Sequence, residues 1–150
     1  MFYEDIKVGD ERILPPVTVD REHMLAFSRQ YNGALCHVDD EFASHTRAGQ
    51  ITAPGIYTFA LLWGEYAPNN FGQEHDIGGS DLEMKFFAPV FVGDTLRARA
   101  YVDEKTDRNP YNGAIWVVME VYNQRDVLVL RSRSSSVILK RDTPAGKLNG

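Results

Sequence analysis

The chain has 150 residues, of which 43% are hydrophobic and 25% are charged, as expected for one globular domain with a single hydrophobic core. Its 21 acidic and 16 basic side chains give a net charge of −5, and no apolar run approaches the ~18 residues that span a bilayer, so composition favours neither a nucleic-acid partner nor a membrane protein. The lone cysteine, Cys36, excludes an intrachain disulfide, and the acidic opening Met1–Asp5 lacks the basic start of a signal peptide; we expect a cytoplasmic protein, with no metal or cofactor.

The first predicted helix begins at Asp20, whose carboxylate can accept hydrogen bonds from the free amides of a helix start. Met24, Phe27 and Tyr31 follow at the i, i+3, i+7 spacing of one apolar helix face. An Asn-Gly pair at 32–33 then ends the periodic pattern. These residues predict an amphipathic helix with one face toward the core.

Two further helices are predicted before the strand-rich half of the chain. A short one begins at Asp39 or Asp40, with Asp39 as its cap, and ends near Gly49. A third begins at Pro54, a residue type that suits the first helical position, and continues through Ile56–Trp63 with hardly a polar side chain. Because a helix that is apolar nearly all round has to be buried, we expect the rest of the chain to wrap around it.

The second half shows the alternation of apolar and polar residues that is typical of β-strands. Four segments have this pattern, each with one apolar face: 82–86, 96–102, 115–121 and 127–139. Turn residues separate them, among them the tight hairpin Asn123–Asp126. Four such strands predict an antiparallel sheet that packs on the buried helix, an α+β domain over residues 1–141. Residues 142–150 lose the apolar pattern and are expected to form a flexible C-terminal tail.

Three parts of the chain carry a resemblance to a known family. They are Tyr3–Asp5 with Val8–Asp10, then Cys36–Ala43, and finally Phe87–Leu96. In their order and spacing the chain resembles the MaoC-like hydratase/dehydratase group of the hot-dog superfamily, which is related to (R)-specific enoyl-CoA hydratases. The resemblance implies a hot-dog fold, with an antiparallel sheet wrapped around a long central helix. It also implies a homodimer or dimer of dimers that binds an acyl-CoA or acyl-carrier thioester at its interface.

The hydratase motif of that family, Asp-x-Asn-Pro-(Ile/Leu)-His-x-Asp, matches this chain in part. The motif histidine falls on His37, the catalytic aspartate falls on Asn32, and the glycine of the following Ile-Ala-His-Gly loop falls on Gly55. The resemblance then implies that His37 is the acid and base, that Asn32 orients water, and that the Gly55 amide polarises the thioester carbonyl. Substrate-binding residues are expected beside Gly55 at the start of the third helix: Pro54, Ile56 and Tyr57.

The asparagine at position 32 leaves the reaction open, because an amide cannot take a proton. One possibility is reversible hydration of an enoyl-CoA, a lyase reaction that uses His37 for proton transfer. A second is hydrolysis by a hot-dog acyl-CoA thioesterase, and a third is a MaoC-like subunit that binds acyl thioesters without chemistry. The Pro-Gly pair at 54–55 also resembles the helix start of hydroxyacyl carrier-protein dehydratases, but residues 58–61 lack the glutamate that those enzymes use.

Overall fold

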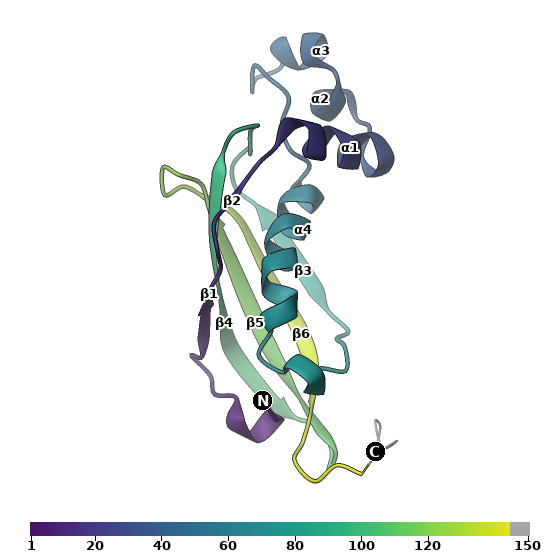
Figure 1. Ribbon diagram of the computed structural model, residues 1–150, viewed down its shortest axis with the longest axis vertical. Coiled ribbons are helices and arrows are strands. Elements are labelled where there is room, and N and C mark those ends of the chain that lie inside the picture. The colour runs from purple at the N-terminus through teal and green to yellow at the C-terminus, as the bar shows by residue number, and fades with distance from the viewer. Residues whose placement is uncertain (145–150) are drawn as a thin grey trace.

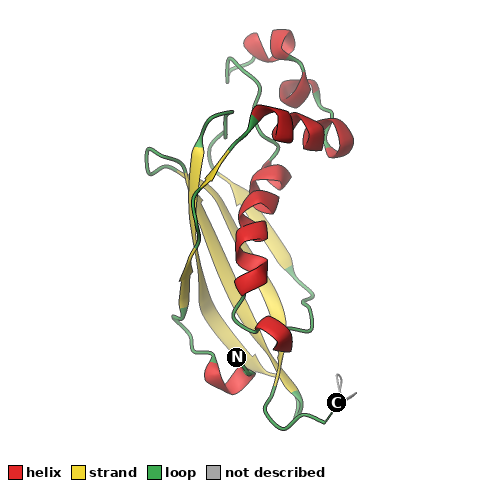
Figure 2. Ribbon diagram, in the orientation of Figure 1, coloured by secondary structure: helices red, strands yellow, loops and turns green. Residues whose placement is uncertain are grey.

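The computed structural model describes residues 1–144 as a long antiparallel sheet with one helix, α4 (Gly55–Tyr66), lying along its inner face (Figure 1). The sheet order is β1-β4-β5-β6-β3, and β2 pairs with β4. The strands are β1 Glu11–Ile13, β2 Val17–Thr18, β3 Leu82–Phe86, β4 Thr95–Asp107, β5 Asn112–Tyr122 and β6 Leu128–Leu139. The other helices are α1 Arg21–Tyr31, α2 Leu35–Val38 and α3 Asp40–Ser44, with short 3-10 helices at Tyr3–Asp5, Ala67–Asn69 and Gln73–His75. Figure 2 shows α1, α2 and α3 gathered at the end of the sheet where α4 begins, so the architecture is the hot-dog fold that the resemblance implies.

The predicted alternation is confirmed on the inner face of β4, β5 and β6. Cross-strand pairing sets two rows of inner-face residues side by side: Ala98, Val121 and Leu130, then Ala100, Met119 and Ser132. All six are at most 5% exposed. α4 lies on these rows and buries Leu62 completely. The hydrophobic core therefore lies between this helix and the middle of the sheet.

β3 is the exception to this burial. Its inner-face residues Leu82 and Phe86 pair with Ser134 and Leu130 of β6, yet Leu82 is 52% exposed and Phe86 is 56% exposed. The expectation that this strand buries its apolar face is therefore wrong within one chain. Because β3 is the edge strand, α4 lies mainly over the inner strands and leaves much of β3 uncovered.

α4 likewise buries one face and not its whole surface. The buried side chains of this helix are Tyr57, Thr58, Leu62 and Tyr66. Ile56, in contrast, is 54% exposed. The expectation of a helix buried all round is wrong for a single chain, because a sheet contacts a helix from one side. α4 also starts one residue later than predicted, with Gly55 as its first residue and Pro54 immediately before it.

Helix α1 is confirmed together with its predicted cap. The Asp20 carboxylate accepts a hydrogen bond from the His23 amide at 2.9 Å, and Asn32 follows the last helical residue as the C-cap. The predicted cap of α3 is also confirmed, since the Asp39 carboxylate accepts a hydrogen bond from the Phe42 amide at 2.9 Å. Both helices thus begin where a carboxylate satisfies a free backbone amide.

Two details of the same region differ from the prediction. α3 ends at Ser44 and not near Gly49. The Thr46 hydroxyl donates to the Ala43 carbonyl at 2.7 Å, and such side-chain bonds compete with the helical ladder. α2 was not predicted at all, because a helix of four residues shows no apolar periodicity.

The last described residues contact the N-terminal segment. The Arg141 guanidinium donates to the Asp5 carboxylate at 2.5 Å, and the Thr143 hydroxyl donates to the Tyr111 carbonyl at 2.7 Å. Residues 145–150 of the predicted tail lie outside the described residues. The division into a domain over 1–141 and a tail over 142–150 therefore stays a prediction.

An ion pair between Arg21 and Asp40 joins the first residue of α1 to the first residue of α3. The guanidinium nitrogens Nη1 and Nη2 donate to the two carboxylate oxygens at 3.2 and 2.7 Å, which is a bidentate geometry. This hydrogen bonding from Arg21 lowers the pKa of the Asp40 carboxyl below its ordinary value. The pair closes a loop of chain that contains both Asn32 and His37.

Replacing Arg21 by methionine should raise the pKa of Asp40 toward its ordinary value, because the hydrogen-bond donors are lost. In the unsubstituted protein, the lowered pKa stabilises the fold fully above the ordinary carboxyl pKa, and this contribution disappears as the pH falls through the lowered value. The effect on stability is small because both side chains are exposed. NMR titration of the Asp40 carboxyl measures the pKa change. Arg29→Met, on the same helix, is the control, and an unchanged Asp40 pKa in Arg21→Met contradicts the assignment.

Candidate active site

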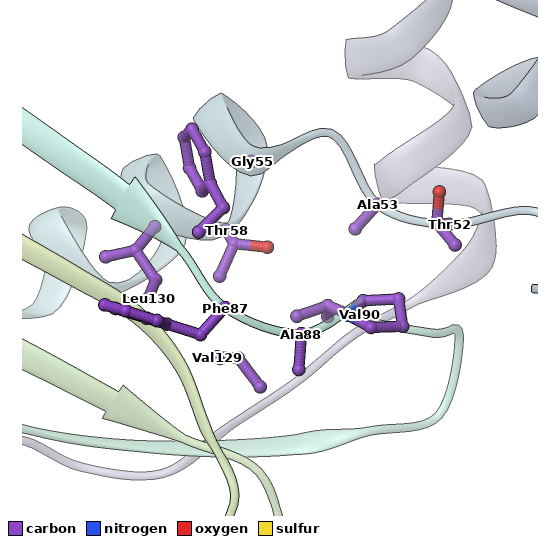
Figure 3. A pocket seen from close by; sticks show the side chains of 11 residues that line it. Thr52, Ala53, Gly55, Thr58, Phe87, Ala88, Val90, Val129 and Leu130 are labelled. Atoms are coloured by element: carbon purple, nitrogen blue, oxygen red, sulfur yellow. The ribbon is translucent and has the colours of Figure 1, made fainter.

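A cavity of about 350 Å³ opens where α4 begins, between the end of β3 and the start of β6 (Figure 3). Its lining is mostly apolar and contains no charged side chain: Thr52, Ala53, Gly55, Thr58, Phe86, Phe87, Ala88, Pro89, Val90, Val129 and Leu130. We call it the α4 cavity. A neutral, apolar cavity suits an acyl group, and its few polar groups determine how that group lies.

The His37 imidazole is held in one orientation beside this cavity. Its Nδ1 atom lies 2.6 Å from the Thr52 carbonyl oxygen, and Thr52 lines the cavity. Because a carbonyl oxygen can only accept a hydrogen bond, Nδ1 carries the proton and donates it. In the neutral ring Nε2 is then unprotonated and able to accept a proton. The half-buried His37 ring is not itself part of the cavity lining.

An extended segment carries Thr52 from the α1–α3 region to the sheet. The Thr52 amide donates to the Cys36 carbonyl at 3.2 Å, and the Ala53 amide donates to the Val90 carbonyl at 2.8 Å. Thr52 also forms an antiparallel bridge with Phe91. The segment therefore connects the residue before His37 to one wall of the cavity.

That wall is held by the Gly-Asp turn at residues 93–94. Gly93 has a φ of 86°, which an L side chain rarely adopts. The Asp94 carboxylate is 6% exposed and accepts hydrogen bonds from the Phe91 amide and the Gln124 side chain, both at 2.9 Å. This buried carboxylate fixes the loop from β3 to β4, which supplies Ala88, Pro89 and Val90 to the cavity.

Gly55 is the predicted site residue that the structure places in the cavity lining. As the first residue of α4, it has an amide without an acceptor inside the helix, at the positive end of the helix dipole. A β-carbon at this position would lie 2.3 Å from Cε1 of the Phe86 ring. A larger side chain at position 55 would therefore displace the Phe86 ring, whereas glycine leaves the ring in place and presents a free amide.

The other predicted residues take different places. Pro54 is buried and Ile56 is exposed, and neither lines the α4 cavity. Tyr57 is buried in the core, its hydroxyl lies 2.7 Å from Nδ1 of the exposed His23 on α1, and burial raises the pKa of Tyr57 to about 12. Asn32 is half-buried, and its backbone N–H donates to the carbonyl of Ser28 at 2.8 Å. Among the described residues, no hydrogen bond joins Asn32 to His37.

Two residues of the site were missed from the sequence. Thr52 orients His37 through its carbonyl, which any residue type offers and which therefore leaves no sequence signal. Thr58 lines the cavity, is 2% exposed, and has no hydrogen-bond partner for its hydroxyl among the described residues. The sequence signal for Thr58 was a hydroxyl-bearing residue among the apolar residues at the start of α4.

The groups gathered at the α4 cavity are an imidazole held by a carbonyl, a free helix amide and a buried hydroxyl. Such a set is able to move a proton and to stabilise a developing negative charge. Within residues 1–144, no three His, Cys, Asp or Glu side chains gather as a metal site requires. None of the helices over the same range is long and apolar enough to cross a membrane.

Known proteins are similar to this chain in sequence and in fold. The chain is 28% identical over 148 residues to the mesaconyl-CoA hydratase of Cereibacter sphaeroides, a match that covers 96% of this chain and 43% of the hydratase. The structure of a monoamine oxidase regulatory protein from Archaeoglobus is 30% identical, with a TM-score of 0.88 and 96% of both chains covered. A MaoC-like dehydratase from Rhodospirillum rubrum is 26% identical, with a TM-score of 0.86, and 94% of this chain and 98% of the dehydratase are covered. The chain thus spans less than half the length of the mesaconyl-CoA hydratase and nearly the whole of the two solved structures.

A family model described as a MaoC-like domain matches residues 6–121, which is more than half of the chain. The matched range includes the helices that carry His37 and Gly55 and extends to Val121, near the end of β5. On sequence and on fold, the chain belongs to the MaoC-like domain family.

Proposed function

We propose that the chain is an enoyl-CoA hydratase that adds water reversibly to a 2-enoyl thioester bound in the α4 cavity. The observation that carries this proposal is the hydrogen bond from His37 Nδ1 to the carbonyl of Thr52, a cavity-lining residue, since it leaves Nε2 free to accept a proton. The matching mesaconyl-CoA hydratase supports the same reaction class. The acyl group lies along the apolar walls, and the thioester carbonyl faces the start of α4.

The reaction needs one proton acceptor that later becomes the donor. Nε2 of His37 takes a proton from water while the water oxygen bonds to C3, and the electrons of the C2–C3 double bond move toward the thioester oxygen. The Gly55 amide stabilises the negative charge on that oxygen. The protonated His37 ring then gives its proton to C2, which completes the addition of water. Asn32 holds the water by hydrogen bonds, as an amide can do without taking a proton.

Replacing His37 by alanine should lower the rate of hydration at least ~100-fold, a loss typical of a removed general acid and base. The thermal midpoint should stay nearly unchanged, because the half-buried ring makes its hydrogen bond to a carbonyl at the edge of the fold. The assay offers a panel of 2-enoyl-CoA thioesters and follows loss of enoyl absorbance together with release of free thiol.

The same assay separates the alternatives. Thiol release from acyl-CoA without hydration identifies a thioesterase. Binding of acyl-CoA without either reaction identifies a subunit without chemistry, the alternative that the Asn32 amide favours. A fall in the thermal midpoint that matches the loss of activity in His37→Ala identifies His37 as a structural residue.

Asn32→Asp should raise hydration ~10-fold or more, because a positioned carboxylate adds a second group able to transfer protons. The substitution nearly preserves shape, and the C-cap hydrogen bond of Asn32 comes from its backbone amide, so the helix end stays intact. Initial rates on the best enoyl-CoA, at matched protein concentration, measure the change. Lower activity in Asn32→Asp would show that the amide itself makes a required hydrogen bond and would contradict the assignment of a missing acid.

The functional form is a homodimer joined through the edge strand β3 and the outer face of α4, alone or as part of a dimer of dimers. Four apolar side chains in this region are more than half exposed in the single chain: Ile56, Leu82, Phe86 and Phe87. β3 has a strand partner on one side only. Burial of these side chains against a second copy removes apolar surface from water and closes the sheet edge. The α4 cavity, which Phe86 and Phe87 line, then lies at the subunit boundary.

Sedimentation at micromolar concentration should give at least the mass of a dimer of the 17.0 kDa chain. Leu82→Glu should shift the protein to the monomer mass, because it places a charge in the proposed interface. Val8→Glu is the matched control, since Val8 is 60% exposed and precedes Gly9, whose amide donates to the Val102 carbonyl of β4 at the opposite side of the sheet from β3. A monomeric unsubstituted protein, or equal masses for both variants, contradicts this interface.

A further inference from the structure

We propose that the Thr58 hydroxyl binds the oxygen at C3 of the substrate, which is the water that adds or the hydroxyl group of the product. This role rests on the proposed function, and it gives the α4 cavity a selective contact for thioesters that carry a 3-hydroxyl group. It adds a substrate contact to the roles of His37, Asn32 and Gly55.

The state of the hydroxyl group is the first observation. Thr58 is 2% exposed, and its Oγ1 atom has no hydrogen-bond partner among the described residues. Its backbone amide already donates to the Pro54 carbonyl at 3.1 Å, so the helix is satisfied at this point. A buried hydroxyl without a partner costs free energy, and most buried polar groups in proteins are hydrogen-bonded. Thr58 is therefore expected to have a partner that enters from outside the chain.

The direction of the hydroxyl group is the second observation. Figure 3 shows the Thr58 oxygen pointing into the α4 cavity, toward the space between Ala53, Ala88 and Val90. These three side chains are apolar and make no hydrogen bonds of their own. The only other side-chain hydroxyl in the lining belongs to Thr52, which lies 3.3 Å from His37 Nδ1. In this part of the cavity, the Thr58 hydroxyl is thus the side-chain group that can form a hydrogen bond to a ligand.

The distance along α4 fits the oxygen at C3. Thr58 lies three residues after Gly55, which is about 4.5 Å along the helix axis. A thioester oxygen held by the Gly55 amide sets the carbonyl carbon at the start of the helix, and C3 is two bonds farther along the acyl group. An oxygen on C3 then comes close to the next turn of α4. The Thr58 hydroxyl can accept a hydrogen bond from this oxygen or donate one to it. It does not act as a base.

Two other hydroxyl groups serve as internal comparisons. Those of Ser28 and Ser132 are also buried and have no hydrogen-bond partner within residues 1–144, and Ser132 is 2% exposed like Thr58. Neither lines the α4 cavity. If removal of any buried, unpartnered hydroxyl changed ligand binding, substitution of each of these three residues would change it. A substrate contact instead predicts that only substitution of Thr58 changes the binding preference.

The test compares two ligands that differ by one hydroxyl group, butyryl-CoA and 3-hydroxybutyryl-CoA, with each enantiomer of the latter measured separately by calorimetry. The unsubstituted protein should bind one enantiomer about 5-fold more tightly than butyryl-CoA, as one neutral hydrogen bond predicts. Thr58→Val, which keeps the shape, should bind butyryl-CoA as before and lose the preference. Thr58→Ser should restore it, and Ser132→Ala should leave it unchanged. The thermal midpoint of Thr58→Val should not fall, because a methyl group replaces an unpaired hydroxyl.

A preference that persists in Thr58→Val overturns the proposal, as does equal binding of the ligands by the unsubstituted protein or failure to bind either one. If Thr58→Val does not fold, loss of the preference in Thr58→Ser with retained butyryl-CoA binding also overturns it. Turnover of 2-butenoyl-CoA by the unsubstituted protein is measured in parallel. Absence of turnover alone counts against the hydratase function, while a Thr58-dependent preference still supports the contact with a 3-hydroxyl group.

Discussion

The packing of α4 against the inner face of β4–β6 is the constraint on which the rest of the structure depends. One face of this apolar helix has to be buried, and the inner rows of the sheet are the apolar surface that the chain offers. Leu62 and Tyr66 are buried in that contact and fix the helix axis. The start of α4 at Gly55 is thereby placed against the Phe86 ring. The cavity arises where helix, edge strand and the first residues of β6 meet.

Two of the residues proposed for catalysis, His37 and Asn32, lie outside this packing. His37 belongs to the small helices at the end of the sheet, and its link to the cavity is a hydrogen bond to the Thr52 carbonyl. The backbone N–H of Asn32 makes the hydrogen bond that ends α1, so this bond does not depend on the side chain at position 32. The end of α1 therefore does not require an asparagine side chain at position 32.

Local sequence patterns were sufficient to predict most helices and strands, because the hydrophobic period of a strand or an amphipathic helix is visible within a few residues. Motif spacing singled out His37 and Gly55, and their catalytic roles stay predictions. Contacts between distant segments could not be predicted: the carbonyl of Thr52 carries no side-chain signal, and the exposure of β3 depends on which strands α4 covers. Tyr57 shows the same limit, since successive residues of a helix face directions about 100° apart, and the residue two after Gly55 is buried in the core, with its hydroxyl next to His23.

The open edge at β3 also has a consequence for solubility. An edge strand with half-exposed apolar residues presents unpaired backbone groups that can recruit foreign strands and start aggregation. Glu83 and Lys85 alternate with the apolar residues of this strand and form an exposed ion pair at 3.6 Å. Charges of this kind act as gatekeepers, because burying them between two wrongly paired sheets costs free energy. The strand thus combines an apolar face suited to a matching partner with a charged face that discourages indiscriminate stacking.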